Sequence, residues 1–426
     1  MNILLIGSGG REHALALALK RSGDDIQIYA NPGNPGIFTY AEYADFDIKD
    51  FDAIAKYCKK SKIDLVVIGP EQFLSDGLAD VLRAQKIDVF GPSQEASRLE
   101  SSKVFSKEFM ITNNIPTAKY KSFNQKEKKE AIKYLNTCSM PIVIKADGLA
   151  AGKGVIVADT LEVAEATINS MFDGKFGKAG SSIIIEEFMV GEEASILAIT
   201  DGTDYITLAP SQDHKRIFEN DKGPNTGGMG VYAPAPVVDN IVLEKVQKEI
   251  IEPTLEACKK MGHPFIGCLY VGLMINNNEP KVVEFNVRFG DPETEAVLPL
   301  VEGNFAGLLK SAAKGKMKKD LIELNTEHST CTVILASEGY PGEFEKGFEI
   351  DGIIAAEKKG AFVYHSGTAM VDDKLVTNGG RVLAVTCVGE DLQTAIKHVY
   401  QRVEKINFKN KYYRKDIGKK GLKYYY

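Results

Sequence analysis

Residues 1–12 read M-N-I-L-L-I-G-S-G-G-R-E, an apolar run that ends in a glycine-rich turn. This pattern predicts a buried strand over residues 3–6, and the Ala- and Leu-rich stretch 12–20 predicts a helix. The alternation continues along the chain, with expected strands at 25–29, 63–68 and 87–90 and expected helices at 51–60 and 78–85. Short apolar strands that alternate with helices indicate a doubly wound parallel sheet. Ligands bind such sheets at the carboxyl ends of the strands, which here places residues 7–11 and 69–71 at the ligand-binding edge.

The pattern changes after Ser101, where we expect a helix over residues 102–112 with Lys103 in its first turn. Short strands with Gly-rich turns follow at 141–145, 154–158, 182–187 and 194–200, and we expect them to be antiparallel. An amphipathic helix over 242–261, broken near Pro253, precedes strands at 268–275 and 280–288. After about residue 320 we expect a small α/β segment with strands at 331–336, 361–365 and 381–387 and a helix at 392–406. The basic and aromatic residues 412–426 are interpreted as a tail.

The chain has 426 residues, of which 44% are hydrophobic and 26% charged, and a net charge of −6. This composition is typical of a folded globular protein and provides no overall attraction to nucleic acid or to anionic membranes. Its six cysteines include no C-x-x-C pair, so the sequence offers no zinc-ribbon or thioredoxin spacing and we expect reduced thiols. With no signal-peptide pattern and no apolar run of about 18 residues, we expect a cytoplasmic protein.

The loop at residues 7–12 is the first candidate ligand site, because backbone amides at the start of a helix bind anions. A dinucleotide fingerprint requires a third glycine where this chain has Glu12, and an acid after the second strand where it has Asn31. A dehydrogenase is therefore disfavoured. A small phosphorylated ligand fits better, and a tight turn without a ligand is the alternative.

The stretch 144–155, I-K-A-D-G-L-A-A-G-K-G-V, lies between two expected strands. The chain has no G-x-x-x-x-G-K-[ST] sequence, so a P-loop is excluded. A Gly-rich hairpin with Lys145 on its entering strand and Lys153 at its tip suits a flexible cover over phosphates, whose charge the lysines would neutralise. The alternative is a mobile hairpin without a ligand.

The most specific signal is V-E-F-N-V-R-F-G-D-P-E at residues 283–293. Side chains alternate along a strand, so Glu284, Asn286 and Arg288 share one face. The opposite face, expected to point into the core, carries Val283, Phe285, Val287 and Phe289. A carboxylate and an amide oxygen suit Mg²⁺, and Arg288 could hold a carboxylate or a phosphate. A solvated polar face is the alternative.

Two weaker motifs complete the set. The apolar strand that ends at Glu186 and Glu187 could present backbone groups to an adenine, with Glu193 on the ribose. The polar run 211–216 and the Gly-rich run 223–230 suit capture of a polar substrate. Taken alone, each is explained at least as well by an ordinary strand end or a solvated loop.

Together these residues resemble the ATP-grasp enzymes, and among them the phosphoribosylamine–glycine ligase (glycinamide ribonucleotide synthetase) family. The resemblance rests on residues 7–13, 144–157, 212–216, 224–230 and 288–293, and extends from Met1 to about Gly418. It implies an α/β and α+β multidomain fold. An N-terminal doubly wound parallel-sheet domain that binds substrate phosphate would occupy 1–101. An ATP-grasp domain would occupy 102–324, with a mobile lid at about 120–190, and a small C-terminal α/β domain with the tail would occupy 325–426.

The resemblance also implies a role for each matching residue. ATP would be bound by Lys103, Lys145, Gly152, Lys153, Gly154, Glu186, Glu187, Phe188, Met189, Glu193, Lys215 and Asn225. Glu284 and Asn286 would hold Mg²⁺ or Mn²⁺. Arg288, Asp291 and Asp213 would act in catalysis, and substrate would be bound by Gly9, Gly10, Glu12, Asp213 and Arg288.

The implied reaction joins glycine to 5-phosphoribosylamine through a glycyl phosphate, with ATP giving ADP and phosphate, in purine synthesis. Phosphoryl transfer needs positioned charge, a metal and a closing cover rather than a protein nucleophile, and the chain has no nucleophile motif. The expected partners are these small molecules and, transiently, the enzyme that supplies phosphoribosylamine, with neither nucleic acid nor membrane. Two alternatives stay open: another ATP-grasp ligase that uses bicarbonate, such as a biotin or aminoimidazole ribonucleotide carboxylase, and a non-catalytic nucleotide-binding protein.

Overall fold

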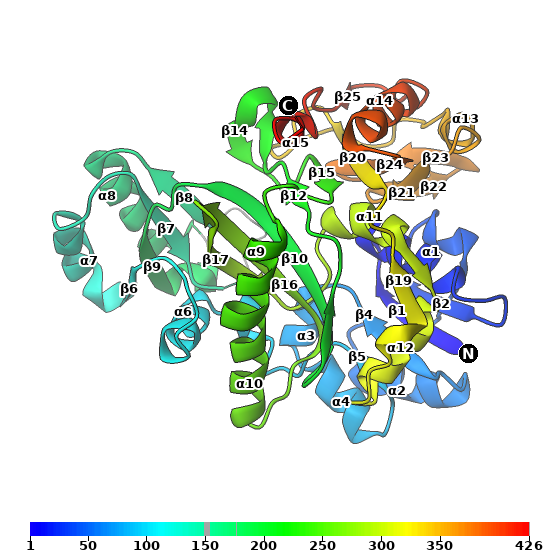
Figure 1. The fold of residues 1–426 in the computed structure, drawn as a ribbon, viewed down its shortest axis with the longest axis horizontal. Coiled ribbons are helices and arrows are strands. Elements are labelled where there is room, and N and C mark those ends of the chain that lie inside the picture. The colour runs from blue at the N-terminus through cyan, green and yellow to red at the C-terminus, as the bar shows by residue number, and fades with distance from the viewer. Residues whose placement is uncertain (149–153, 176, 426) are drawn as a thin grey trace.

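The first hundred residues fold around a parallel sheet, as predicted (Figure 1). It has five strands in the order β3-β2-β1-β4-β5, of which β3 was not expected from the sequence. The side chains of β1 alternate between two cores, with Ile3 and Leu5 in one and Leu4 and Ile6 in the other. A parallel strand covered on both faces requires such a continuous apolar run. The strands are β1 (Asn2–Gly7), β2 (Gln27–Pro32), β3 (Ala41–Tyr43), β4 (Leu65–Ile68) and β5 (Val89–Phe90). The helices are α1 (Gly10–Lys20), η1 (Ile37–Thr39), α2 (Phe51–Lys60), α3 (Glu71–Ser75) and α4 (Leu78–Ala84).

This computed structural model describes residues 1–148, 154–175 and 177–425. No helix within these ranges is both long and apolar enough to cross a membrane.

Two antiparallel four-stranded sheets follow, connected by α5 (Arg98–Ser101) and α6 (Lys103–Thr112) to the first sheet (Figure 1). The lid sheet has the order β6-β9-β7-β8, with β6 (Tyr120–Asn124), β7 (Ile142–Ala146), β8 (Val155–Ala158) and β9 (Ser182–Glu187). Its helical cover is η2 (Gln125–Glu127), α7 (Lys128–Leu135), α8 (Leu161–Ser170), η3 (Met171–Lys175) and η4 (Gly177–Ser181). The central sheet has the order β11-β10-β16-β17, with β10 (Glu192–Asp201), β11 (Tyr205–Thr207), β16 (Ile266–Asn276) and β17 (Glu279–Asn286).

The long helix that packs against the central sheet is interrupted, as its proline predicts. It consists of α9 (Asn240–Val246), a wider π-helical turn η6 (Gln247–Ile251) and α10 (Glu252–Lys260). Pro253 lies in the first turn of α10 and lacks the amide hydrogen that would continue the preceding ladder. The break therefore lies one turn before the proline.

A β-bulge in the β16–β17 pair changes one prediction. Gly272 pairs with Glu284 but Leu273 pairs with Val282, so Val283 is the extra residue. A bulge shifts the alternation of side chains by one position. Val282 is therefore fully buried and Val283 only half-buried, and the prediction that Val283 faces the core is wrong. The remaining predicted core residues, Phe285, Val287 and Phe289, are buried.

The C-terminal sheet has the order β12-β15-β20-β24-β21. Its strands are β12 (Gln212–Asp213), β15 (Gly230–Ala233), β20 (Ser329–Ser337), β21 (Phe362–His365) and β24 (Arg381–Gly389). Two of them precede residue 325, so the sheet joins segments on both sides of the predicted domain boundary. Connecting elements are β13 (Arg216–Phe218), η5 (Glu219–Asp221), β14 (Lys222–Asn225), α11 (Glu293–Val297), η7 (Leu298–Leu300), β18 (Val301–Gly303), α12 (Phe305–Ala313), η8 (Lys319–Leu321), β19 (Ile322–Leu324), α13 (Ile353–Glu357), β22 (Thr368–Val371), β23 (Lys374–Thr377) and α14 (Leu392–Val403).

The interpretation of residues 412–426 as a tail is wrong. Strand β25 (Lys411–Tyr412) pairs with β20, and α15 (Lys419–Leu422) follows it. Arg414 is fully buried and forms ion pairs with Asp221 and Asp416, while Ile417 lies in the core. The basic and aromatic composition did not indicate a packed segment, because one partner of its buried charge, Asp221, lies far away in the sequence.

Candidate active site

Two of the predicted phosphate ligands lie at the junction of the lid sheet and the central sheet. Lys103 is the first residue of α6, which the Ser102 side chain caps, and its Nζ donates to the Gly148 carbonyl at 3.0 Å. Lys145 on β7 is buried, and its Nζ donates to the Val283 carbonyl at 3.3 Å. The fold therefore brings lysines from a helix and a lid strand against the strand that carries the predicted metal ligands.

A buried carboxylate, Glu186, pairs with Lys145 and with a second lysine of α6, Lys107. One oxygen of Glu186, Oε2, lies 3.0 Å from Lys145 Nζ and 3.2 Å from Lys107 Nζ. Burial lowers the pKa of Lys107 to about 8, although the Glu186 carboxylate opposes that shift. Sequence reasoning missed Lys107, yet its position one turn after Lys103 on α6 was a usable signal.

The predicted adenine and ribose contacts extend from the end of β9 through the linker to the start of β10. The Glu186 side chain points into the lysine cluster, and its backbone lies in the sheet between Tyr120 of β6 and Val143 of β7. Glu187 accepts a hydrogen bond from the Lys119 amide at 3.0 Å, and Phe188 and Glu193 are exposed. Met189 lies half-buried between them, and Gly154 is buried just before β8. Gly152 and Lys153 lie outside the described residues.

The predicted metal ligands, Glu284 and Asn286, lie two residues apart on β17. Burial alone would raise the pKa of Glu284, but Lys145, Lys215 and Lys103 lower it below its usual value. An ionised carboxylate and an amide oxygen are a suitable donor pair for a hard divalent cation. Within the ranges the structure describes, no group of three or more His, Cys, Asp or Glu residues could hold a metal. A cation here would therefore need phosphate oxygens and water to complete its coordination, as Mg²⁺ commonly does.

Arg288 follows these ligands and is held by acids from the N-terminal half of the chain. Its Nη2 lies 2.9 Å from Glu100 Oε1, and its Nε lies 3.4 Å from Glu71 Oε2. Burial opposes the charge, but Glu100 and Glu71 together raise the pKa of Arg288. Neither acid was predicted as a site residue, although Glu71 was placed at the ligand-binding edge of the first sheet.

A second charged cluster lies around Lys215. Lys215 Nζ lies 2.7 Å from Asp213 Oδ2 and 3.6 Å from Glu293 Oε1. Burial raises the pKa of Asp213 to about 6, with Lys215 opposing and Glu293 adding to the shift. Asn225 lies on β14 and pairs with Arg216, which follows Lys215 directly in the sequence. The pKa of Asp213 therefore lies nearer to neutral pH than that of an ordinary aspartate.

Two further predicted segments are the glycine-rich loop at residues 7–12 and the acidic turn at residues 290–293, and the acidic turn contacts the C-terminal sheet. The Gly9 amide donates to Glu12 Oε2 at 2.7 Å, and Arg11 Nε lies 2.5 Å from Glu12 Oε1. The Glu12 carboxylate therefore fixes the loop itself, with Gly10 buried beside it. Asp291 Oδ1 lies 3.0 Å from Arg381 Nη2 on β24. Arg381 has no motif around it and could be found only through the fold.

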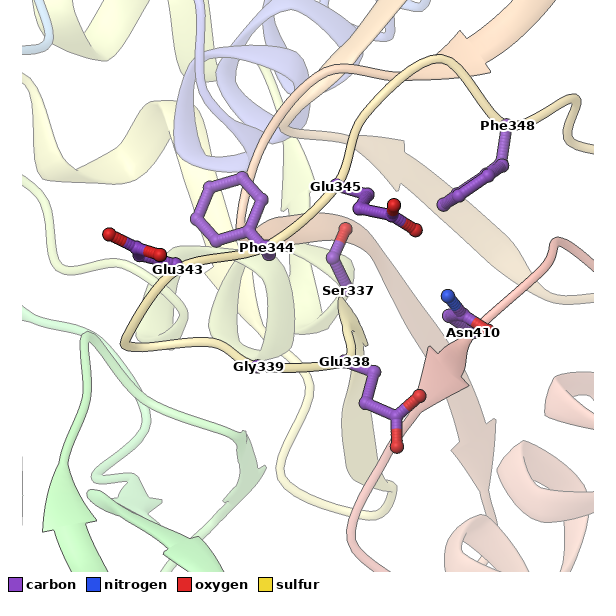
Figure 2. A pocket seen from close by; sticks show the side chains of 8 residues that line it. All are labelled: Ser337, Glu338, Gly339, Glu343, Phe344, Glu345, Phe348 and Asn410. Carbon is purple, nitrogen blue, oxygen red and sulfur yellow. The ribbon is translucent and has the colours of Figure 1, made fainter.

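Two cavities lie apart from these residues. The cavity in Figure 2, of about 360 Å³, lies beside the end of β20. It is lined by Ser337, Glu338, Gly339, Glu343, Phe344, Glu345, Phe348 and Asn410. A second cavity of about 690 Å³ lies between the first sheet and the C-terminal region, near His13 and His365. Neither contains a predicted site residue, so the convergence of charge marks the candidate site better than cavity size does.

Known protein families resemble this chain over most of its length. Three family models match: the N domain of phosphoribosylglycinamide synthetase over residues 1–100, its ATP-grasp (A) domain over 101–294 and its C domain over 330–420. A phosphoribosylamine–glycine ligase from Mesorhizobium japonicum is 47% identical over 418 residues, 98% of each chain.

Solved structures extend the comparison. The crystal structure of a phosphoribosylamine–glycine ligase from Thermotoga maritima has a TM-score of 0.85 at 34% identity, covering 98% of this chain and 100% of that one. The biotin carboxylase domain of a Hydrogenobacter thermophilus 2-oxoglutarate carboxylase is 14% identical, with a TM-score of 0.71 over 96% of this chain and 91% of that one, and shares the fold alone. The chain therefore belongs to the phosphoribosylglycinamide synthetase family.

Proposed function

We propose that this chain ligates glycine to 5-phosphoribosylamine at the expense of ATP, through a glycyl phosphate, in purine synthesis. The observation that supports it most is the convergence of Lys103, Lys145 and Lys215 on an ionised Glu284, with Arg288 beside it. Such a cluster suits a triphosphate and a carboxylate together. It contains the charges that phosphoryl transfer requires and needs no protein nucleophile.

In the first step, a glycine carboxylate oxygen attacks the γ-phosphorus of ATP. The bond between that phosphorus and the β–γ bridging oxygen breaks, and ADP leaves. Lys103, Lys145 and Lys215 stabilise the charge that develops on the phosphoryl oxygens, because fixed cations in a buried site act strongly. Arg288 orients the glycine carboxylate and Asp291 supports that orientation. A divalent cation, Mg²⁺ or Mn²⁺, held by Glu284 and Asn286 would neutralise phosphate charge.

In the second step, the amine of phosphoribosylamine attacks the carbonyl carbon of glycyl phosphate. The bond from that carbon to the phosphate oxygen breaks, phosphate leaves, and the amine nitrogen loses a proton. Asp213 is our candidate acceptor, because its pKa of about 6 leaves it ionised yet poised near neutral pH. Gly9, Gly10 and Glu12 form the loop that faces the substrate phosphate side.

The adenine and ribose of ATP would lie along the β9–β10 linker. Backbone groups of Glu186, Glu187, Phe188 and Met189 would face the adenine, and Glu193 would accept the ribose hydroxyls. The hairpin that includes Gly152, Lys153 and Gly154 would close over the phosphates and exclude water, which would otherwise hydrolyse the acyl phosphate. Asn225 would lie beside Lys215 on the phosphate side.

Further proposals concern the protein as a whole. The domains divide near residues 101 and 325, with the lid at about 120–190, although β12 and β15, which precede residue 325, complete the C-terminal sheet. The enzyme works in the cytoplasm and receives its unstable amine substrate in a transient contact with the enzyme that makes it. Neither nucleic acid nor membrane takes part.

The test is ADP release by the purified chain with Mg-ATP, glycine and phosphoribosylamine generated in situ, each omitted in turn. We expect release only when all three are present. Release with bicarbonate in place of glycine would assign the chain to a carboxylating ATP-grasp ligase. Saturable ATP binding without release under any of these conditions would favour a non-catalytic nucleotide-binding protein.

A further inference from the structure

Gln212, on β12, is a buried residue to which no role has been given, although it opens the polar run 212–216. Its Nε2 donates to the Glu193 carbonyl at 2.6 Å, and its Oε1 accepts from the Tyr232 hydroxyl group. Turning the amide over would set its oxygen against the Glu193 carbonyl oxygen, and neither of these atoms can donate. The side chain is therefore held in one orientation, with both ends of its amide in use.

The carbonyl that Gln212 contacts lies at the beginning of β10, before the residues 198–200 that pair with β11. Alternate residues of an antiparallel strand turn their amide and carbonyl groups away from a given neighbour. Ser195 turns away from β16 in this way and exchanges two backbone hydrogen bonds with Ser211, at 2.8 and 2.9 Å. Glu193 turns to the same side two residues earlier, and its carbonyl meets the Gln212 side chain. That side chain thus takes the place of a neighbouring strand at the beginning of β10.

Gln212 is itself supported by the C-terminal region. Its backbone pairs with that of Tyr232 on β15, whose ring is fully buried. A Cβ atom added at Gly421 would lie 2.7 Å from Tyr232 Cε2, so the backbone of α15 lies directly against this ring. The hydrogen bond from Gln212 to Glu193 is therefore made by a side chain that has packed structure on its far side.

The preceding residue, Glu192, contacts the same C-terminal segment. Its Oε1 accepts a hydrogen bond from the Tyr424 hydroxyl group at 2.7 Å and lies 2.6 Å from Lys423 Nζ. Burial alone would raise the pKa of Glu192, but the hydrogen bonds from Lys423 and Tyr424 lower it. The Lys423 side chain is 55% exposed, so water weakens this contact. Two consecutive residues of β10 are thus tied to the C-terminal region, and the buried tie is the one through Gln212.

We propose that Gln212 is a positioning residue for ATP, which fixes the Glu193 backbone and so directs the Glu193 carboxylate toward the ribose hydroxyl groups. The inference rests on the function proposed above, in which Glu193 accepts those hydroxyl groups. Because the Glu193 side chain is exposed, the protein sets its direction through the backbone. A carboxylate that already has the right direction loses less freedom when the nucleotide binds.

The test is Gln212→Met, which keeps the length of the side chain but removes both hydrogen bonds. The same change at exposed Gln401 is the control. Calorimetry with Mg²⁺ present gives the Kd of ATP and of 2′,3′-dideoxy-ATP, which lacks both ribose hydroxyl groups. For Gln212→Met we expect about a fivefold rise in the ATP Kd, while the dideoxy-ATP Kd and the glycine KM stay within about twofold. In a Glu193→Ala background, Gln212→Met should change the ATP Kd by less than about twofold.

An ATP Kd within about twofold of the wild-type value in folded Gln212→Met would overturn the proposal. Equal weakening of ATP and dideoxy-ATP would also overturn it, because a general loosening of the fold has that effect. A further loss of about fivefold in the Glu193→Ala background would show that Gln212 does not act through Glu193. If Gln212→Met does not fold, Gln212→Asn keeps the amide but is one methylene shorter. It should weaken ATP to a similar extent, and an unchanged ATP Kd would refute the contact.

The two proposals fail differently. Wild-type protein without ADP release that depends on glycine and phosphoribosylamine defeats the proposed function. An active wild type in which Gln212→Met binds ATP as tightly as before defeats only this inference.

Discussion

Replacing Glu186 by alanine would leave Lys107 and Lys145 buried without their shared carboxylate. The side chains are almost inaccessible, at 2% for Glu186, 3% for Lys107 and 6% for Lys145. Removing one partner of a buried ion pair typically costs about 3–5 kcal/mol, because it leaves an uncompensated charge. We therefore expect Glu186→Ala to lower the free energy of unfolding by about that amount at pH 7.

The loss should be smaller at pH 9. The pKa of Lys107 is already lowered to about 8 by burial, and without Glu186 it would fall further, so at high pH this lysine escapes the penalty by losing its proton. Urea denaturation followed by circular dichroism measures the change, since the chain has no tryptophan. Adding Lys107→Met to Glu186→Ala should restore part of the stability.

The neighbouring acid is a matched control. Glu187 is 38% exposed and lies 3.9 Å from Lys281, so Glu187→Ala should change the unfolding free energy by less than about 1 kcal/mol. Equal effects of the two alanine variants would refute the reasoning. So would a loss below about 1 kcal/mol for Glu186→Ala, or a larger loss at pH 9 than at pH 7.

Four further changes test the site and the packed C-terminus. Glu284→Ala should abolish metal-dependent ADP release without lowering the midpoint of thermal unfolding, and residual metal dependence would remove the metal assignment. Arg288→Ala should raise the glycine KM about tenfold but the ATP KM by less than about threefold, and the reverse pattern would place Arg288 on the nucleotide. The pKa of Asp213 is raised to about 6, so protonated Asp213 stabilises the fold below pH 3.8, and this contribution is lost as the pH rises through about 6. The kcat should fall as the pH drops through about 6, because Asp213 then becomes protonated. In Asp213→Asn this acidic fall in kcat should be absent. Ile417→Ala should cost about 2–4 kcal/mol in urea denaturation, whereas exposed Tyr425→Ala should stay within about 0.5 kcal/mol; equal costs would mean that residues 411–425 are not packed in solution.

The parallel sheet, the antiparallel sheets and the helix break at Pro253 could be predicted because their signals are local. The bulge at Val283 could not, since inserting one residue leaves the composition of a strand unchanged and only the pairing with Gly272 reveals it. The packed C-terminus was also missed for a physical reason. A buried arginine is rare unless it is paired; Asp416 lies beside Arg414 in the sequence, but its other partner, Asp221, lies far away and only the fold reveals it.

The candidate site divides in the same way. Residues whose type and spacing indicate chemistry, such as Glu284 and Asn286 on one strand, could be proposed directly. Residues that act through a distant partner could not: Glu100 holds Arg288 across 188 positions of sequence, and Arg381 reaches Asp291 from another sheet.

The acids around the cations have a consequence for ligand binding. Lys145 lies 3.0 Å from Glu186, Lys215 lies 2.7 Å from Asp213 and Arg288 lies 2.9 Å from Glu100, so each cation has an internal partner before any ligand arrives. Burial without such partners would lower the pKa of the lysines and remove the charge that phosphates need. When ATP and glycine bind, their phosphate and carboxylate groups would therefore take the place of the internal carboxylates next to these cations. The affinity for each ligand then depends on acids that do not touch it, and weakening such an acid should alter binding without changing a single direct contact.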